Sequence, residues 1–318
     1  MRSVILYRKC DFSDEELKAA QGAGFYCTDM RPNIQKDDVI VGRFSLWPFY
    51  ADQEREFKLV GAKLINTHAQ HSYITDLMNW VEDLKELTPR TWANLHEIPD
   101  DGTQFVLKGE THSKKSQWST HMFAKNKAAA IQVHSRLSED GLIGSERIYT
   151  REFVPLVEYG KSISGCPISK EFRFFVLHGE VLCGGYYWSI VDDTEITKPS
   201  VNEVPKEFLD EVLKRVAHRV PAFAVDVAQT KDDRWVVIEL NDLQFSGLSD
   251  NDPTLFYSRL KTVMNKHYPE ARPTHIVDPF DSAGQTGDLG TDIANTPDLE
   301  LYEMTDSGVL HDMFPKVK

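Results

Sequence analysis

Short apolar runs alternate with amphipathic stretches through the first hundred residues, a rhythm typical of parallel strands joined by helices. Ser13, followed three positions later by Glu16, has the pattern of a capping box and predicts the start of the first helix. The pattern therefore predicts a small α/β domain over residues 1–87. Its expected strands are Val4–Tyr7, Phe25–Thr28, Val39–Val41 and Lys63–Asn66, and its further helices are Asp52–Val60 and Tyr73–Leu87.

Beyond the segment Thr88–Trp92 the strands follow one another with turn residues between them, which favours antiparallel pairing. This region, residues 88–270, is predicted to form a second, α+β domain. Its expected strands are Phe105–Lys108, Arg147–Phe153, Glu171–Leu177, Val181–Trp188, Ala222–Ala228 and Trp235–Asn241, and its helices are Lys127–Leu137, Lys206–Arg219 and Pro253–His267.

The last two of those strands flank the polar run Gln229–Arg234 and predict a β-hairpin. Folding the hairpin about its centre places Asp226 opposite Glu239, and Asn241 shares a strand face with Glu239. Two carboxylates and an amide oxygen on adjacent strands suit Mg²⁺. The alternative is that these polar residues only line the solvent face of an edge hairpin.

Composition narrows the class of protein. The chain has 318 residues, 41% hydrophobic and 27% charged, which is typical of a globular protein. Its net charge of −13 argues against non-specific binding to nucleic acid or to an anionic membrane. Much of that charge lies in residues 271–318, which are predicted to form an acidic, loosely attached tail. The four cysteines are scattered without a Cys-x-x-Cys pair, so we expect neither zinc nor disulfides and a cytoplasmic location.

A phosphate site in so acidic a chain requires a local cluster of cations. Lys108 ends an apolar strand, where an ammonium group is costly unless an anion compensates it. The loop that follows adds Lys114 and Lys115, but the chain has no Walker-type glycine loop. The alternative is that Lys108 extends to the surface and that the loop is a basic turn.

Two further strands carry candidate binding residues. The backbone at Glu152–Val154 is suited to hydrogen bonds with an adenine edge, with Phe153 or Val154 against its face; a buried strand that ends in a carboxylate is the alternative. Arg173 lies in an aromatic strand and shares a face with Glu171. A buried arginine needs a phosphate or a carboxylate partner, so a structural Arg–Glu pair remains open.

The order of these features resembles the ATP-grasp superfamily: a strand lysine, a basic loop, the Glu-Phe-Val hinge, a strand arginine, and an aspartate followed by Glu-x-Asn. More narrowly, it resembles the divergent clade marked by two arginines and a lysine. That clade includes relatives of the eukaryotic cell-division-cycle protein that helps to assemble a translation initiation factor, and bacterial and phage proteins. The matching residues are Lys108, Arg151, Arg173, Asp226 and Ile238–Asp242. The resemblance covers roughly residues 88–265 and implies an ATP-grasp fold with antiparallel sheets.

The resemblance implies roles by position. Lys108 would contact the ATP phosphates, with Lys114 or Lys115 closing over them, and Arg173 would neutralise the transferred phosphate with help from Arg151. Two departures are evident: the loop after Lys108 is rich in Ser and Lys rather than Gly, and a second upstream lysine has no counterpart unless Arg90 replaces it. The remaining implied contacts are adenine at Glu152, Phe153 and Val154, ribose at Glu158, and Mg²⁺ at Asp226, Glu239 and Asn241.

The expected function is an ATP- and Mg²⁺-dependent carboxylate–amine ligase that forms an acyl-phosphate, with a peptide or protein among its candidate substrates. A non-catalytic ATP-binding assembly factor and an ATP-grasp kinase are the alternatives. The sequence does not define the substrates or the oligomeric state, because the acceptor side of such a cleft is built from variable loops.

Overall fold

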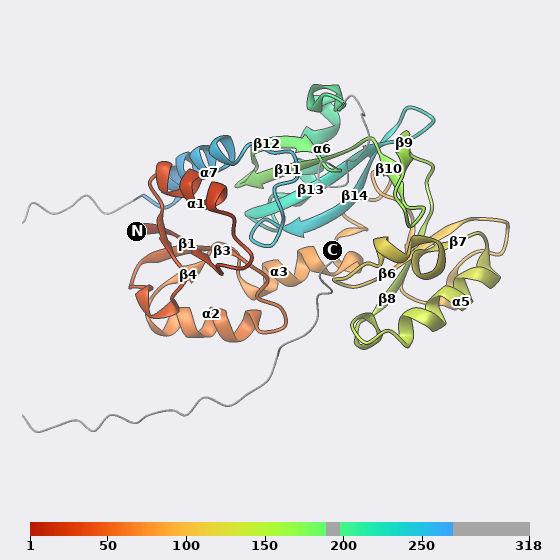
Figure 1. Ribbon diagram of the computed structural model, residues 1–318, viewed down its shortest axis with the longest axis horizontal. Helices are drawn as coiled ribbons and strands as arrows, with labels where there is room; N and C mark the ends of the chain where they lie inside the picture. The colour runs from red at the N-terminus through yellow and green to blue at the C-terminus, as the bar shows by residue number, and fades with distance from the viewer. Residues whose placement is uncertain (189–197, 270–318) are drawn as a thin grey trace, which may run out of the picture. The chain divides into compact units, whose positions relative to one another are not determined.

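The alternating apolar runs at the N-terminus form a four-stranded parallel sheet, as the sequence predicts (Figure 1). Alternate side chains of its central strands enter different cores: Ile5 and Val39 pack on the side of α1 (Asp14–Gly22), and Val4 and Ile40 on the side of α2 (Tyr50–Leu59). Its strands run in the order β2 (Tyr26–Thr28), β1 (Arg2–Tyr7), β3 (Asp38–Arg43) and β4 (Lys63–Leu64). In this computed structural model, residues 1–188 and 198–269 are described, and they belong to one compact unit, Met1–Arg272. The predicted tail, residues 271–318, lies outside them.

The predicted helix Tyr73–Leu87 is wrong. The chain instead forms α3 (His68–Thr75) and a single turn, α4 (Leu77–Trp80). Thr67 starts α3 earlier than expected with a complete capping box, and Asp76 ends it because this residue adopts an extended backbone and caps the next turn through its side chain. The Asp76 carboxylate also accepts a hydrogen bond from the Tyr149 hydroxyl at 2.6 Å, so a tertiary contact fixes the break.

The middle of the chain forms an antiparallel sheet that carries Lys108 and Arg151. Helix α5 (Lys127–Ser138) covers it, with Ala130, Val133 and Leu137 packed on Phe105 and Leu107. Its strands run in the order β5 (Thr91–Trp92), β8 (Ile148–Glu152), β6 (Phe105–Gly109) and β7 (Phe123–Ala124). A separate two-stranded ribbon pairs β9 (Glu158–Lys161) with β10 (Pro167–Ser169).

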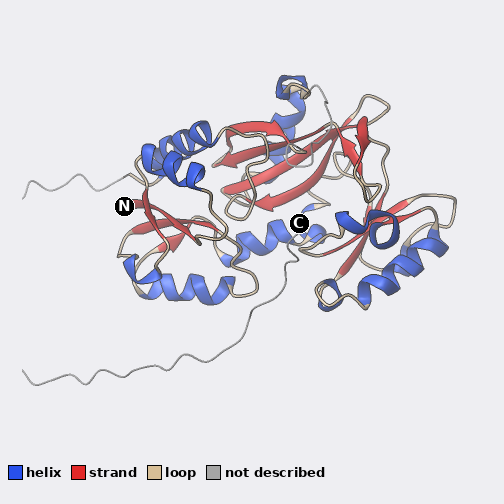
Figure 2. Ribbon diagram, in the orientation of Figure 1, coloured by secondary structure: helices blue, strands red, loops and turns tan. Residues whose placement is uncertain are grey.

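The second antiparallel sheet carries Arg173 and the predicted metal hairpin, and its strands are drawn in red in Figure 2. Its two faces lie against different helices: Phe174 and Phe223 pack towards α6 (Lys206–Val216), while Phe175 packs towards α7 (Pro253–His267). Its strands run in the order β12 (Glu180–Tyr186), β11 (Glu171–Leu177), β13 (Ala222–Gln229) and β14 (Trp235–Asp242).

This architecture confirms the predicted fold class, a parallel α/β part followed by antiparallel sheets with helices. Most predicted strands and helices differ from the observed ones only at their ends. The division of residues 1–272 at position 87 remains a prediction. Within the described residues, no helix combines the length and apolar character that a membrane crossing requires.

Gly185, in β12, lies close to the backbone of Asp250 and Asn251. A Cβ at this position would lie 2.7 Å from the backbone N of Asn251 and 2.7 Å from the backbone carbonyl carbon of Asp250. We expect Gly185→Ala to lower the free energy of unfolding by about 1–3 kcal/mol. Backbone atoms, unlike a side chain, cannot relieve the clash by changing rotamer. Urea denaturation measures the loss.

Gly22 provides the matched control. It lies in α1, and a methyl group added to its Cα would meet no atom within 4 Å. Gly22→Ala should raise the unfolding free energy by about 0.5–1 kcal/mol, because alanine loses less backbone entropy than glycine when a helix forms. Equal behaviour of the two variants would contradict the close approach at Gly185.

Candidate nucleotide and acceptor site

Two adjoining cavities lie between the antiparallel sheets. The larger, of about 610 Å³, is lined by residues of the hinge and of the β9–β10 ribbon, and the smaller, of about 370 Å³, by residues of α3, the β6 loop and β14. Four residues line both cavities: Lys108, Ser113, Lys115 and Glu239. The two cavities therefore meet at a cluster of two cations, a hydroxyl and a carboxylate.

An ion pair between Lys108 and Glu239 forms the centre of this junction and joins β6 to β14. Both side chains are largely buried, with exposed fractions of 12% and 24%. Burial alone would raise the pKa of Glu239, but Lys108 and Lys115 lower it to about 2. Glu239 is therefore a carboxylate held among cations, and Lys108 has a buried anion as its partner rather than solvent.

The hairpin has the predicted register, with Asp226 paired to Glu239. A bulge between Asp226 and Val227 shifts the register within the hairpin, since Val227 pairs with Val237. Glu239 and Asn241 both line the smaller cavity. Asp226 has no exposed surface and lines neither cavity. The three predicted metal ligands are thus close in space, but only Glu239 and Asn241 line a cavity.

Arg173 accounts for the burial of Asp226. Its Nε and Nη2 donate to the two carboxylate oxygens of Asp226 at 2.8 and 2.7 Å, and its Nη1 donates to the carbonyl of Gly247 at 3.0 Å. The guanidinium also lies 4.8 Å from the centre of the Tyr187 ring and lines the smaller cavity. Its carboxylate partner is Asp226, so the Arg–Glu alternative within β11 is wrong.

Glu171 lies in the wall of the larger cavity and has hydrogen-bond partners other than Arg173. Its Oε2 accepts hydrogen bonds from Ser169 at 3.0 Å and from the Trp188 indole at 3.1 Å. Burial raises the pKa of Glu171 to about 7, although Lys115 opposes the rise. Glu171 was not expected in the site, because the sequence shows only its spacing from Arg173.

The basic loop after β6 contributes one of its two lysines to the cavities. Lys115 donates to the Tyr187 hydroxyl at 2.7 Å; burial lowers its pKa, but Tyr187, Glu171 and Glu239 outweigh burial and raise it. Lys114 instead pairs with Asp140 at 2.7 Å and lines neither cavity. Of the two lysines that the sequence offers, the structure brings Lys115 to the junction.

Arg151 lies in the wall of the larger cavity and supports β14. It donates to the carbonyl of Ile238 and, through Nη2, to the Thr88 hydroxyl at 2.7 Å. Burial lowers its pKa to about 10, with Glu239 opposing the shift. Arg151 thereby holds the backbone immediately before Glu239.

The predicted hinge lines the larger cavity, as does Glu158. The N–H of Phe153 donates to the carbonyl of Gln104, while the N–H of Val154 has no acceptor in the described part of the chain. Glu152 pairs with Arg90 at 2.7 Å, and Glu158 pairs with Lys231 at 2.9 Å. The hinge therefore offers one backbone donor to a ligand in this cavity.

The donor set fits a divalent cation that takes part of its coordination from a ligand. Glu239 offers carboxylate oxygens, and Asn241, whose Nδ2 lies 3.5 Å from Asp226, retains its Oδ1. Both oxygens of Asp226 are already bound by Arg173. Among residues 1–188 and 198–269, no group of three or more His, Cys, Asp or Glu is arranged to hold a metal, so phosphate oxygens would have to complete the shell.

Several lining residues had no sequence signal. Tyr187 and Trp188 follow β12 and contact Lys115, whereas His71 and His112 line the smaller cavity from distant segments. An isolated histidine in an amphipathic helix is not distinguishable from a core residue by spacing. Only the tertiary fold brings these side chains to the site.

Comparison with known proteins gives one family match. The family described as ATP-grasp domain, R2K clade family 3, matches residues 97–260. No curated protein sequence matches the chain.

Solved structures share the fold at low sequence identity. A RimK domain ATP-grasp protein from Sphaerobacter thermophilus DSM 20745 is 14% identical, with 81% of this chain and 99% of that chain covered and a TM-score of 0.50. The D-cycloserine synthetase DcsG is 15% identical, with coverage of 82% and 99% and a TM-score of 0.52. The ATP-grasp ligase PsnB, complexed with a minimal precursor, Mg and ADP, is 9% identical, with coverage of 84% and 98% and a TM-score of 0.51. At these identities the likeness shows the fold alone.

Asp226→Ala should destabilise the chain strongly, because it leaves the Arg173 guanidinium buried without its carboxylate. We expect a loss of about 3–5 kcal/mol in the free energy of unfolding, measured by urea denaturation. Glu158→Ala, which breaks the more exposed pair with Lys231, is the control and should cost about 0–1 kcal/mol. A cost at Asp226 no larger than at Glu158 would contradict the structural role of this pair.

Proposed function

The chain belongs to the ATP-grasp domain family R2K clade family 3, and from this membership and its two joined cavities we propose that it is an ATP- and Mg²⁺-dependent carboxylate–amine ligase. The observation that carries the proposal is the junction at Lys108, Lys115 and Glu239, which lines both cavities. A nucleotide in the larger cavity and a carboxylate substrate in the smaller one would meet there.

The larger cavity suits the adenine end of the nucleotide. Val154 offers its N–H to the base edge, and the rings of Phe123 and Phe153, whose centres are 5.1 Å apart, provide apolar surface. Glu158 lies in the same wall and is the proposed partner of the ribose hydroxyls. The phosphates would then extend towards the junction, where Lys108 and Lys115 supply positive charge.

The junction suits phosphoryl transfer from ATP to a carboxylate. Glu239 and Asn241 would hold Mg²⁺, which when bound neutralises phosphate charge. Lys108, now paired with Glu239, would exchange that carboxylate for a phosphate. Arg173 lines the smaller cavity and is the proposed cation for the transferred phosphoryl group, while Asp226 fixes its orientation through two hydrogen bonds.

The second half of the reaction joins the activated carboxylate to an amine, with phosphate as the leaving group. This chemistry requires a pocket that excludes water from the acyl-phosphate. The smaller cavity is lined by the aromatic side chains of Trp47, Tyr187 and Phe245, which would exclude water from the acyl-phosphate. A peptide or protein substrate is proposed because PsnB, which shares the fold, is complexed with a precursor, and because the half-exposed Trp47 lies at this cavity.

The test incubates the chain with Mg²⁺, ATP and hydroxylamine and measures the formation of ADP and hydroxamate. The candidate carboxylate substrates are free L-amino acids and blocked peptides that contain Asp or Glu. Hydroxylamine captures an acyl-phosphate as a hydroxamate, so the assay separates a ligase from a kinase or a protein that only binds ATP. We expect Lys108→Met and Glu239→Gln each to lower the rate by about 10²–10³-fold, since each removes a charge from the junction.

Lys206→Met is the matched control, because Lys206 is exposed on α6 and pairs with Asp210 of the same helix. Its rate should equal that of the unaltered chain. Calorimetry with a non-hydrolysable ATP analogue provides the decisive negative result: absence of Mg²⁺-dependent binding to the unaltered chain would refute the proposal.

A further inference from the structure

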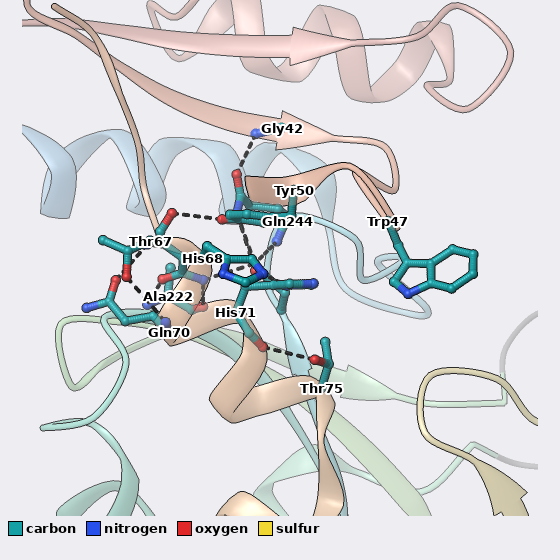
Figure 3. A network of polar contacts seen from close by, with 12 residues as sticks. Gly42, Trp47, Tyr50, Thr67, His68, Gln70, His71, Thr75, Ala222 and Gln244 are labelled. Atoms are coloured by element: carbon teal, nitrogen blue, oxygen red, sulfur yellow. Dashed lines mark hydrogen bonds and ion pairs between the residues drawn. The ribbon is translucent and has the colours of Figure 1, made fainter. Parts of the chain in front are cut away.

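His71 lies in the wall of the smaller cavity, on α3 from the N-terminal part of the chain (Figure 3). It is 5% exposed, so the imidazole belongs to the cavity wall rather than to the surface. The same cavity is lined by Lys108 and Glu239 of the junction. The acyl group that the proposed reaction activates would therefore lie in the cavity that His71 borders.

The hydrogen bonds of Asp242 set the tautomer of His71. The Nδ1 of His71 is 3.1 Å from the Asp242 Oδ2, and the Asp242 side chain has no exposed surface. The other carboxylate oxygen accepts from the Asn66 side-chain amide and the Gln244 backbone N–H, each at 3.0 Å. A carboxylate that accepts from all its neighbours requires the hydrogen on Nδ1 of His71, which leaves the lone pair on Nε2.

Packing fixes the ring in this orientation. The imidazole stacks on Tyr50 with ring centres 4.2 Å apart and an interplanar angle of 10°, and Phe245 meets it edge-on at 5.1 Å. The Tyr50 hydroxyl is itself held, since it donates to the Asn66 carbonyl at 2.8 Å and accepts from Gln244 at 2.9 Å. In Figure 3 the side chains of Tyr50, His71 and Gln244 lie together in this network. A ring rotation would break both the Asp242 contact and the stack.

The carboxylates in the lining of the smaller cavity are already engaged. Glu239 pairs with Lys108, Glu110 pairs with Arg147, and Asp242 accepts from the donors named above. The other imidazole in the wall, His112, also has its Nδ1 bound to a carboxylate, that of Glu146, but its side chain is 34% exposed, against 7% for His71. His71 thus combines a fixed ring, a buried carboxylate behind it and an Nε2 that no described residue engages.

We propose that His71 is the proton acceptor for the attacking amine. The inference rests on the proposed function. The amine nitrogen forms a bond to the acyl carbon, the bond from that carbon to the phosphate oxygen breaks, and phosphate leaves with the electron pair. The proton released by the amine passes to Nε2 of His71, and the Asp242 carboxylate stabilises the resulting imidazolium.

The first measurement needs no substrate. Long-range ¹H–¹⁵N spectra of the full chain with labelled histidine report which ring nitrogen carries the hydrogen, and His71→Asn assigns the signal. We expect the Nδ1–H tautomer and modification of His71 by diethyl pyrocarbonate, with the exposed His68 as the internal positive control. An Nε2–H tautomer, or an unmodified His71 beside a modified His68, would overturn the proposal.

The second measurement separates the two half-reactions. His71→Asn keeps an N–H donor for Asp242 but removes the base. We expect this variant to bind Mg-ATP and to form hydroxamate within about threefold of the unaltered chain, because hydroxylamine attacks as a neutral, weakly basic nucleophile. Amide formation with an alkyl amine should fall by about 10²-fold or more.

The outcomes distinguish the two proposals. If the unaltered chain forms no hydroxamate, the ligase assignment fails, and this inference fails with it. If His71→Asn forms amide and hydroxamate at unaltered rates, only the role of His71 is refuted. If the variant loses hydroxamate formation as well, His71 supports the site structurally and is not the proton acceptor.

Discussion

The ion pair between Lys108 and Glu239 is the contact on which the rest of the site depends, because it joins two sheets at the point where the two cavities meet. Removing two charges from water is costly, and a buried pair recovers that cost only with good geometry or further partners. Here Lys115 adds a second cation near the carboxylate and helps to lower its pKa. In the proposed reaction, a phosphate would replace Glu239 as the partner of Lys108, and a metal ion would replace Lys108 as the partner of Glu239.

The N-terminal part of the chain completes the site by holding the segment that follows β14. Arg43 donates to the carbonyls of Leu243 and Ser246 at 3.0 and 2.9 Å, and its guanidinium also pairs with Glu16 at 3.0 Å. Gln244 accepts from the Gly42 N–H at 3.0 Å. These contacts position the segment whose Gly247 carbonyl Arg173 uses, so the parallel sheet and the antiparallel sheets form one structural unit around the smaller cavity.

The sequence patterns predicted those features of the fold that depend on local backbone geometry. Strand alternation and a polar turn were sufficient to place Asp226 opposite Glu239, and helix Pro253–His267 was predicted with the bounds that the structure has. The break at Asp76 was missed because a tertiary hydrogen bond from Tyr149 supports it. Pairings between distant segments, such as His71 with Asp242, have no sequence periodicity and could not be predicted. The roles of the candidate site residues in binding and catalysis remain predictions.

Lys115 has a further thermodynamic consequence, since this charged residue lines both cavities. An anion that occupies either cavity changes the electrostatic potential felt by a ligand in the other. Linkage makes this effect reciprocal: the factor by which the first ligand alters the affinity of the second equals the factor in the opposite direction. One shared side chain is thus sufficient to couple the affinities of ligands in the two cavities, without any movement of the protein backbone.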